Sequence, residues 1–174
     1  MDFLRNIRFV VAVLNERLII YKRKKEVLIM GFMNASQKLN DRSWEIVNKA
    51  FASAMPEAEG YTVCYGYWMK SGLMSKTMYN YAVGFKADTC EIILIPIDSD
   101  GSETGEASHF QKSDITAAKK TLQGAWRISS AFAKKPLELM VPGFVPDSLE
   151  GAYQLPINQQ EQAQQFMAMM KGLK

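Results

Sequence analysis

The sequence predicts an α+β protein built around a mostly antiparallel sheet. Three observations support this fold class: a helical pattern of apolar residues around Trp44, a run of strand-like segments joined by short connections, and a capped helix near the C-terminal end. The connections between the strands leave no room for the crossover helices that parallel strands require. With 174 residues, of which 48% are hydrophobic and 22% charged, the chain can form its core without a metal or a disulfide.

Residues 1–33 differ from the rest of the chain in pattern and charge. Their apolar residues recur at three- and four-residue intervals and predict an amphipathic helix that ends in the basic run 22–25. Such a helix is typical of a segment packed on the body of the protein, which we favour, or of one that lies on an anionic membrane or a partner. The apolar positions are Phe3, Leu4, Ile7, Val10, Val11, Leu14, Leu18 and Tyr21.

A third hypothesis for this segment is that translation begins after it, at Met30 or Met33. The residues Lys25-Glu26-Val27 are those that a purine-rich ribosome-binding sequence would encode if it were read in this frame, shortly before Met30. The sequence thus predicts an N-terminal helical extension over 1–33 and a single domain over 34–174. It leaves open whether translation starts at Met1, Met30 or Met33. Contact with a membrane surface is expected only if residues 1–25 are translated.

The domain is expected to open with a helix. Asn40 or Asp41 can cap it, and it should stop at Ala54, before Pro56. Its apolar positions share one face, which we expect to be buried: Trp44, Val47, Phe51 and Ala54.

Strands are expected to follow as consecutive antiparallel neighbours. The first three are rich in aromatic and β-branched residues or alternate between apolar and small or polar ones, at 61–69, 78–86 and 91–97. A polar loop occupies 98–105, and weaker strand candidates lie at 107–110, 115–120, 125–129 and 137–141.

A second helix should close the chain. Asn158 can cap it, with Glu161 completing a capping box, and Gly172 marks its end. We expect Gln159 to be solvated and Met169 to be exposed. The apolar stripe consists of Ala163, Phe166, Met167 and Met170.

The sequence predicts no catalytic residues, no cofactor and no metal. His109 is the single histidine, the cysteines Cys64 and Cys90 are far apart, and no HExxH, CxxC, GxSxG or phosphate-binding glycine motif occurs. Unpaired cysteines and the absence of a secretory or membrane-spanning pattern favour a reducing cytoplasm. Residues 1–33 hold a local excess of four positive charges, so the remainder carries −1 of the overall +3, which argues against nucleic-acid binding.

Several segments resemble those of a family of uncharacterised bacterial proteins with a pleckstrin-homology-like (PH-like) domain. The matching segments are Tyr81–Phe85, Glu91–Asp98, Lys112–Ile115, Val141-Pro142 and Tyr153–Gln159. The resemblance implies a bent antiparallel sheet or partly open barrel, closed at one end by the C-terminal helix. It also implies a binding or scaffolding module without known catalytic residues.

We therefore expect a non-enzymatic module that binds another protein, through a segment added along a sheet edge or laid beside the closing helix. The candidate contacts are Lys70 and Lys76 at the first hairpin loop, His109, and Phe166 and Met170 on the closing helix. The hairpin loop lacks the arginine typical of a phosphoinositide clamp. The rival hypothesis is a small-molecule binder or enzyme whose site combines His109, Asp114, Tyr65 and Tyr79.

Overall fold

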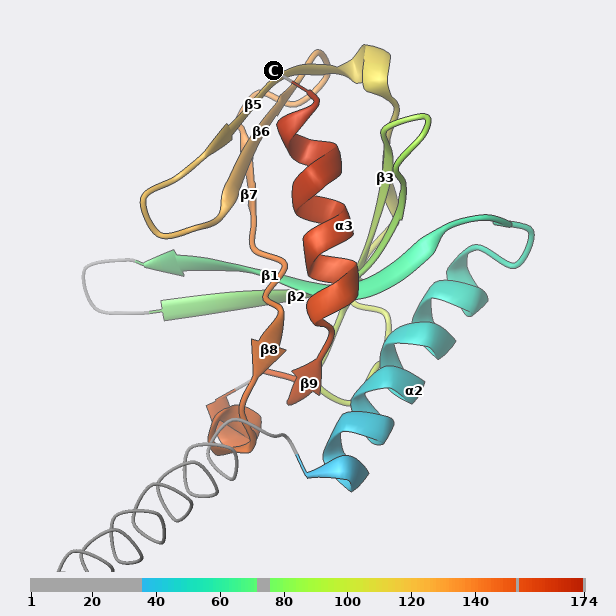
Figure 1. The fold of residues 1–174 in the computed structure, drawn as a ribbon, viewed down its shortest axis with the longest axis vertical. Helices are drawn as coiled ribbons and strands as arrows, with labels where there is room; N and C mark the ends of the chain where they lie inside the picture. The colour runs from blue at the N-terminus through green and yellow to red at the C-terminus, as the bar shows by residue number, and fades with distance from the viewer. Residues whose placement is uncertain (1–35, 72–75, 153, 174) are drawn as a thin grey trace, which may run out of the picture. The chain divides into compact units, whose positions relative to one another are not determined.

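The computed structural model describes residues 36–71, 76–152 and 154–173. Within these ranges the chain is α+β, with antiparallel sheets and two α-helices, α2 (Gln37–Ala54) and α3 (Gln160–Lys171) (Figure 1). No helix in these ranges is long and apolar enough to cross a membrane. The expected N-terminal helix and the start at Met30 or Met33 lie outside the described residues.

Three antiparallel sheets contain all the strands of the described ranges. The first has the order β1-β2-β3-β4 and consists of β1 (Thr62–Ser71), β2 (Lys76–Lys86), β3 (Glu91–Ile97) and β4 (Ser108–Phe110). The second has the order β5-β6-β7 and consists of β5 (Ile115–Lys120), β6 (Trp126–Ser130) and β7 (Leu137–Leu139). The third pairs the short strands β8 (Phe144–Val145) and β9 (Ile157–Asn158).

The first two sheets meet at β1, beyond the end of β7. There Tyr67 and Met140 exchange two backbone hydrogen bonds of 2.8 Å. Among the described residues the strands form open sheets and do not close into a barrel. The antiparallel arrangement and the C-terminal helix are as the sequence predicts.

Side chains of the first sheet alternate between two hydrophobic clusters, one on each face. Cys64, Val83 and Leu94 point into a cluster that also contains residues of the second sheet and of α3. Their neighbours Tyr65 and Ala82 point into a cluster with α2. This alternation follows from the period of two in a strand. The first sheet is therefore covered by α2 on one face and by α3 and the second sheet on the other (Figure 1).

Helix α2 packs closely against β2. A Cβ atom added at Gly84 would lie 2.1 Å from Cε2 of Phe51, so the Phe51 ring rests on a position that only glycine can leave open. The helix begins at Gln37, earlier than expected from the cap at Asn40 or Asp41. The Oδ1 atom of Asn40 instead accepts the backbone N–H of Asn158 (2.8 Å).

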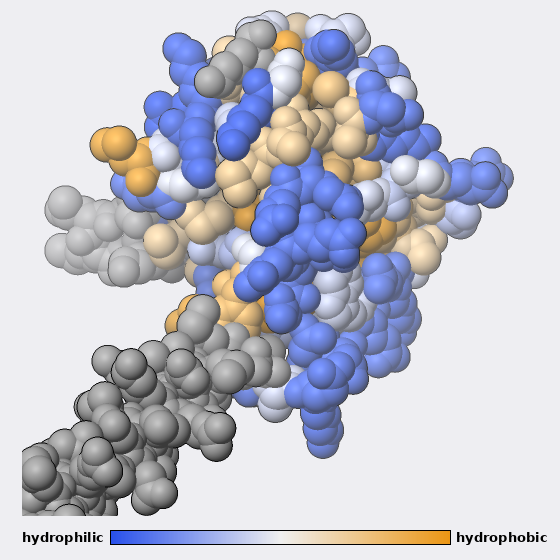
Figure 2. All heavy atoms as spheres, viewed as in Figure 1, coloured by the Kyte–Doolittle hydropathy of each residue, from blue (hydrophilic) through white to orange (hydrophobic). Residues whose placement is uncertain are grey.

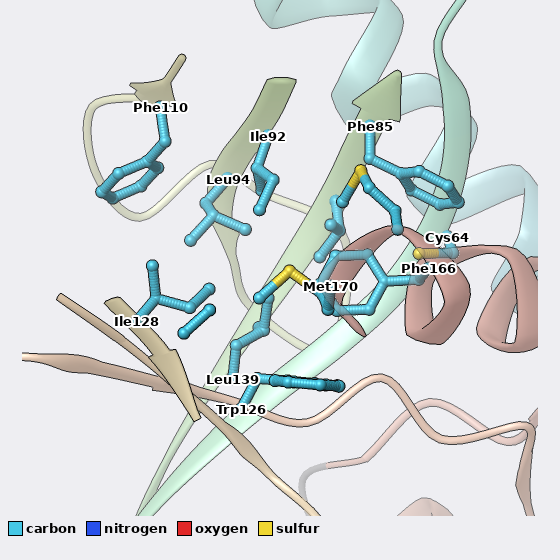
Figure 3. Packing of buried hydrophobic residues seen from close by; sticks show 13 residues of the cluster. Cys64, Phe85, Ile92, Leu94, Phe110, Trp126, Ile128, Leu139, Phe166 and Met170 are labelled. Atoms are coloured by element: carbon cyan, nitrogen blue, oxygen red, sulfur yellow. The ribbon is translucent and has the colours of Figure 1, made fainter. Parts of the chain in front are cut away.

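Helix α3 inserts its apolar face between the two larger sheets. Phe166 and Met170 lie in the core, and the Phe166 ring meets that of Phe85 edge-on, with centroids 5.4 Å apart (Figure 3). Met169 is also buried, contrary to expectation, because the helix contacts both sheets over a wide face. Hydrophilic residues cover the outer surfaces of α2 and α3 (Figure 2).

The start of α3 differs from the predicted capping box. Asn158 belongs to β9, and the residue that precedes the helix is Gln159, whose side chain makes no cap hydrogen bond. Gln159 is buried, not solvated. Its Oε1 accepts the backbone N–H of Tyr65 (2.8 Å), and its Nε2 donates to the carbonyls of Tyr65 (2.7 Å) and Pro142 (2.8 Å). The side-chain amide thus pairs with the outer edge of β1 as a neighbouring strand would.

Candidate functional site

The β1-β2 hairpin extends past the second sheet (Figure 1). Side chains of the hairpin and of the second sheet line a recess between them. We call this recess the hairpin notch. It is a hollow of about 470 Å3, open to solvent, with β1 on one side and the outer face of β6 and β7 on the other. Its lining residues are Trp68, Met69, Lys70, Arg127, Lys135, Pro136 and Glu138.

Aromatic and apolar side chains form one wall of the hairpin notch. Trp68 on β1 pairs in register with Tyr79 on β2, and their rings stack with centroids 5.1 Å apart. Trp68 is partly buried, whereas Met69 is 46% exposed. Tyr79 is 40% exposed and supports the Trp68 ring without lining the recess itself. Because the hairpin projects beyond the second sheet, these side chains have no core to enter. A partly exposed tryptophan beside exposed tyrosine and methionine is typical of binding surfaces.

Basic side chains surround this apolar wall. Arg127 on β6 lies opposite Glu138 on β7 and donates two hydrogen bonds to its Oε1, from Nε (2.9 Å) and Nη2 (2.5 Å). Lys70 and Lys135 add two more positive charges, so the lining has three basic residues and one acidic residue. The hairpin notch therefore combines a net positive charge with aromatic and apolar surface.

Two of the predicted contacts lie on the hairpin, as the sequence indicated. Lys70 is exposed and lines the hairpin notch. Lys76 begins β2, where its backbone pairs with Ser71, and its side chain lies outside the described part of the structure.

His109 belongs to a different cluster, at the opposite end of the β2-β3 hairpin. Its Nε2 lies 3.5 Å from Oε2 of Glu91, which also accepts the hydroxyl of Tyr61 (2.6 Å). Burial and the hydrogen bond to Glu91 raise the pKa of Tyr61 to about 12. The same hydrogen bond lowers the pKa of Glu91, with a smaller contribution from Thr89. This cluster links β3 and β4 to the residue that precedes β1.

Phe166 and Met170 face the interior rather than a partner. Their exposed fractions are 1% and 0%, and both contact residues of the two larger sheets (Figure 3). In this structure a partner would have to displace α3 to reach either side chain.

The four residues of the rival small-molecule site lie in separate surroundings. Tyr65 is buried on the α2 side of the first sheet, where it donates to Oδ1 of Asn80 (2.7 Å), whereas Tyr79 stacks on Trp68. The carboxylate of Asp114 accepts the backbone N–H of Gln111 (2.8 Å) at a helical turn. Within the described ranges, no group of three or more His, Cys, Asp or Glu residues is placed to hold a metal ion.

A larger hollow, of about 590 Å3, lies between α2 and the loop after β3. Its charges oppose one another, with Arg42 and Lys49 on the helix and Glu45, Asp100 and Glu103 around them. No aromatic residue is found in its lining within the described residues. The hairpin notch is therefore the better candidate for a specific binding site.

Most residues of the hairpin notch escape sequence analysis, because they come from strands far apart in the chain. Trp68 reads as an ordinary strand residue, and Arg127 lies in a weak strand candidate. Lys70 at the expected hairpin loop and the basic pair Lys134-Lys135 are the indications that the sequence offers. Comparison with known proteins adds no assignment: no protein-family model matches this sequence, and no curated protein does.

Proposed function

We propose that this domain is a non-enzymatic module that binds a segment of another protein in the hairpin notch. The observation that carries the proposal is the partly exposed Trp68 ring, which stacks on the exposed Tyr79 and lies beside Met69, with Lys70, Arg127 and Lys135 around it. Tryptophan, tyrosine and arginine contribute disproportionately to the affinity of protein interfaces, because they combine large apolar area with polar groups. Several of these groups stand on paired strands, so binding does not have to order the backbone that carries them.

The wider architecture supports the same proposal. A four-stranded and a three-stranded antiparallel sheet, with a final helix between them, are consistent with a PH-like domain. Such a fold is a scaffold on which loops and sheet ends bind diverse ligands, so the fold alone names no partner.

Other exposed apolar residues provide weaker support for an interface elsewhere. Leu122 is fully exposed at the β5-β6 turn, and Phe132 is 61% exposed after β6. Phe132 stacks on Phe110 with centroids 5.9 Å apart. Neither residue lines the hairpin notch. Single exposed apolar residues are common on protein surfaces and need no partner to explain them.

Selection from a random peptide library displayed on phage tests the proposed function. The full chain should enrich peptides whose binding falls when Trp68 is replaced by alanine. Phe132→Ala is the matched control, since it also removes one aromatic ring of a stacked pair, outside the notch. Circular dichroism should confirm that both variants remain folded, and Met69→Ala serves as a second variant at the notch. The proposal would be contradicted if the selected peptides bound Trp68→Ala and Met69→Ala with the same affinity as wild type.

A further inference from the structure

The outer face of the second sheet places a row of charged residues beside the hairpin notch. Lys119 on β5 pairs in register with Arg127, which pairs with Glu138. Residues directly opposite one another in an antiparallel sheet point to the same face. Lys119 therefore extends the positive surface of the notch across the sheet, while Lys70 borders the notch on the hairpin and Lys135 borders it in the β6-β7 connection.

Glu138 is the acidic residue within this positive surface. Arg127 is 57% exposed and Glu138 is 29% exposed, and both hydrogen bonds between them go to Oε1. Exposed ion pairs of this kind contribute little to stability, because water solvates both partners well when they separate. Another carboxylate could therefore replace Glu138 as the partner of Arg127 with little loss of stability.

We propose that the partner is an acidic, extended peptide segment with an apolar anchor, and that Glu138 competes with the partner's carboxylates for Arg127. This inference rests on the proposed function and names the chemical class of its partner. The anchor would contact Trp68 and Met69, and acidic residues on either side would meet Lys70, Lys135 and Arg127. An extended peptide can enter a recess, whereas the flat surface of a folded protein or a membrane would contact only the rim of the recess. The recess therefore favours a peptide.

Two synthetic peptides test this inference by fluorescence anisotropy with the full chain. The first contains Asp and Glu around a central Leu-Phe pair, and the second replaces every Asp and Glu by Asn and Gln. The acidic peptide should bind more tightly, and its affinity should decrease as salt is added, because salt screens the exposed charges. Anionic vesicles of phosphatidylserine and phosphatidylcholine are measured beside the peptides.

Charge variants assign the binding to the hairpin notch. Lys70→Glu and Lys135→Glu should each weaken binding of the acidic peptide by roughly three- to tenfold, the range for a few exposed charge contacts. Lys112→Glu, the same change on an exposed residue outside the notch, should leave affinity within about twofold. Glu138→Gln should strengthen binding, because Arg127 then faces the peptide without a charged competitor.

Several outcomes overturn the inference. Equal affinity for the two peptides would show that charge is not recognised, while library peptides that still depend on Trp68 would leave the proposed function standing. Equal losses in Lys112→Glu and Lys70→Glu would indicate nonspecific attraction. Binding to vesicles but not to the acidic peptide, abolished by Lys70→Glu, would identify a membrane surface as the ligand instead. Weaker peptide binding in Glu138→Gln would refute the competition by Glu138.

Discussion

Gln159 links the last helix to the outer edge of β1, and its replacement gives the sharpest test of the fold. In Gln159→Leu, the Tyr65 N–H and the carbonyls of Tyr65 and Pro142 lose their partners. Leucine is close to glutamine in size, so the cavity that it leaves is small. A buried group without its hydrogen bond costs about 1–3 kcal/mol, so losing all three should lower the free energy of unfolding by at least about 3 kcal/mol.

Urea unfolding, followed by far-ultraviolet circular dichroism, measures this loss. Gln164→Leu is the control, since Gln164 is exposed on the same helix and the free energy of unfolding should change by less than about 0.5 kcal/mol. A loss below about 1 kcal/mol in Gln159→Leu would refute the reasoning, because the three backbone groups would then have found other partners.

The charged substitution Gln159→Glu adds a pH signature. A carboxylate at this position can accept the Tyr65 N–H but has nothing to donate to the two carbonyls. Burial beside carbonyl oxygens should raise its folded-state pKa above the unfolded value of about 4.3. The variant should therefore come closest to wild-type stability at low pH and lose stability as the pH rises. Equal stability differences at low and neutral pH would contradict a buried carboxyl.

Further predictions concern three other features. Gly84→Ala places a methyl group against the Phe51 ring and should destabilise the domain by roughly 1–3 kcal/mol in the same urea assay. Phe166→Ala should cost about 3–5 kcal/mol, since it empties a core position on α3. In Tyr61→Phe, carbon-detected NMR titration should show the Glu91 pKa rising toward its usual value, because the largest lowering contribution is lost. The lowered pKa of Glu91 stabilises the wild-type fold at pH values above the pKa of an unfolded carboxyl group, and this stabilisation is lost as the pH falls. Tyr61→Phe should therefore lose less stability on acidification than wild type.

Gly84→Ala and Phe166→Ala each have a matched control substitution. Gly105→Ala adds a methyl group that meets only Pro96, at 3.5 Å, so an equal loss at Gly84 and Gly105 would speak against the clash with Phe51. Gln164→Ala should be nearly neutral beside Phe166→Ala. An unchanged Glu91 titration in Tyr61→Phe would mean that another group lowers its pKa.

Strands with strong local patterns were predictable from the sequence. The apolar run Glu91–Ile97 between polar turns has the bounds that the sequence predicts, and β2 begins two residues before its predicted start. The weaker candidate at 115–120 also has its predicted bounds, as β5. The beginning of α3 was not predictable, because the side chain of Gln159 forms hydrogen bonds with the backbone of Tyr65 and Pro142, which are distant in the chain. Local capping rules favoured Asn158, but Asn158 belongs to β9, where its backbone pairs with Phe144 of β8.

The candidate site was predictable only in outline. The expected hairpin loop pointed to Lys70. Trp68 and Arg127, however, line the same recess only because the first two sheets meet at Tyr67 and Met140. Conversely, a stripe of apolar residues on the closing helix looks the same whether it faces a core or a partner. The second sheet, which covers Phe166 and Met170, decides between these possibilities.

The outer edge of β1 provides a natural reporter of partial opening. The Tyr65 amide is held by a side chain at the start of the C-terminal helix, whereas the Tyr67 amide, two residues along the same edge, is held by the backbone of Met140. Detachment of the helix alone would expose the Tyr65 amide to deuterium and leave the Tyr67 amide protected. Comparing the exchange rates of these two amides therefore separates undocking of the helix from global unfolding.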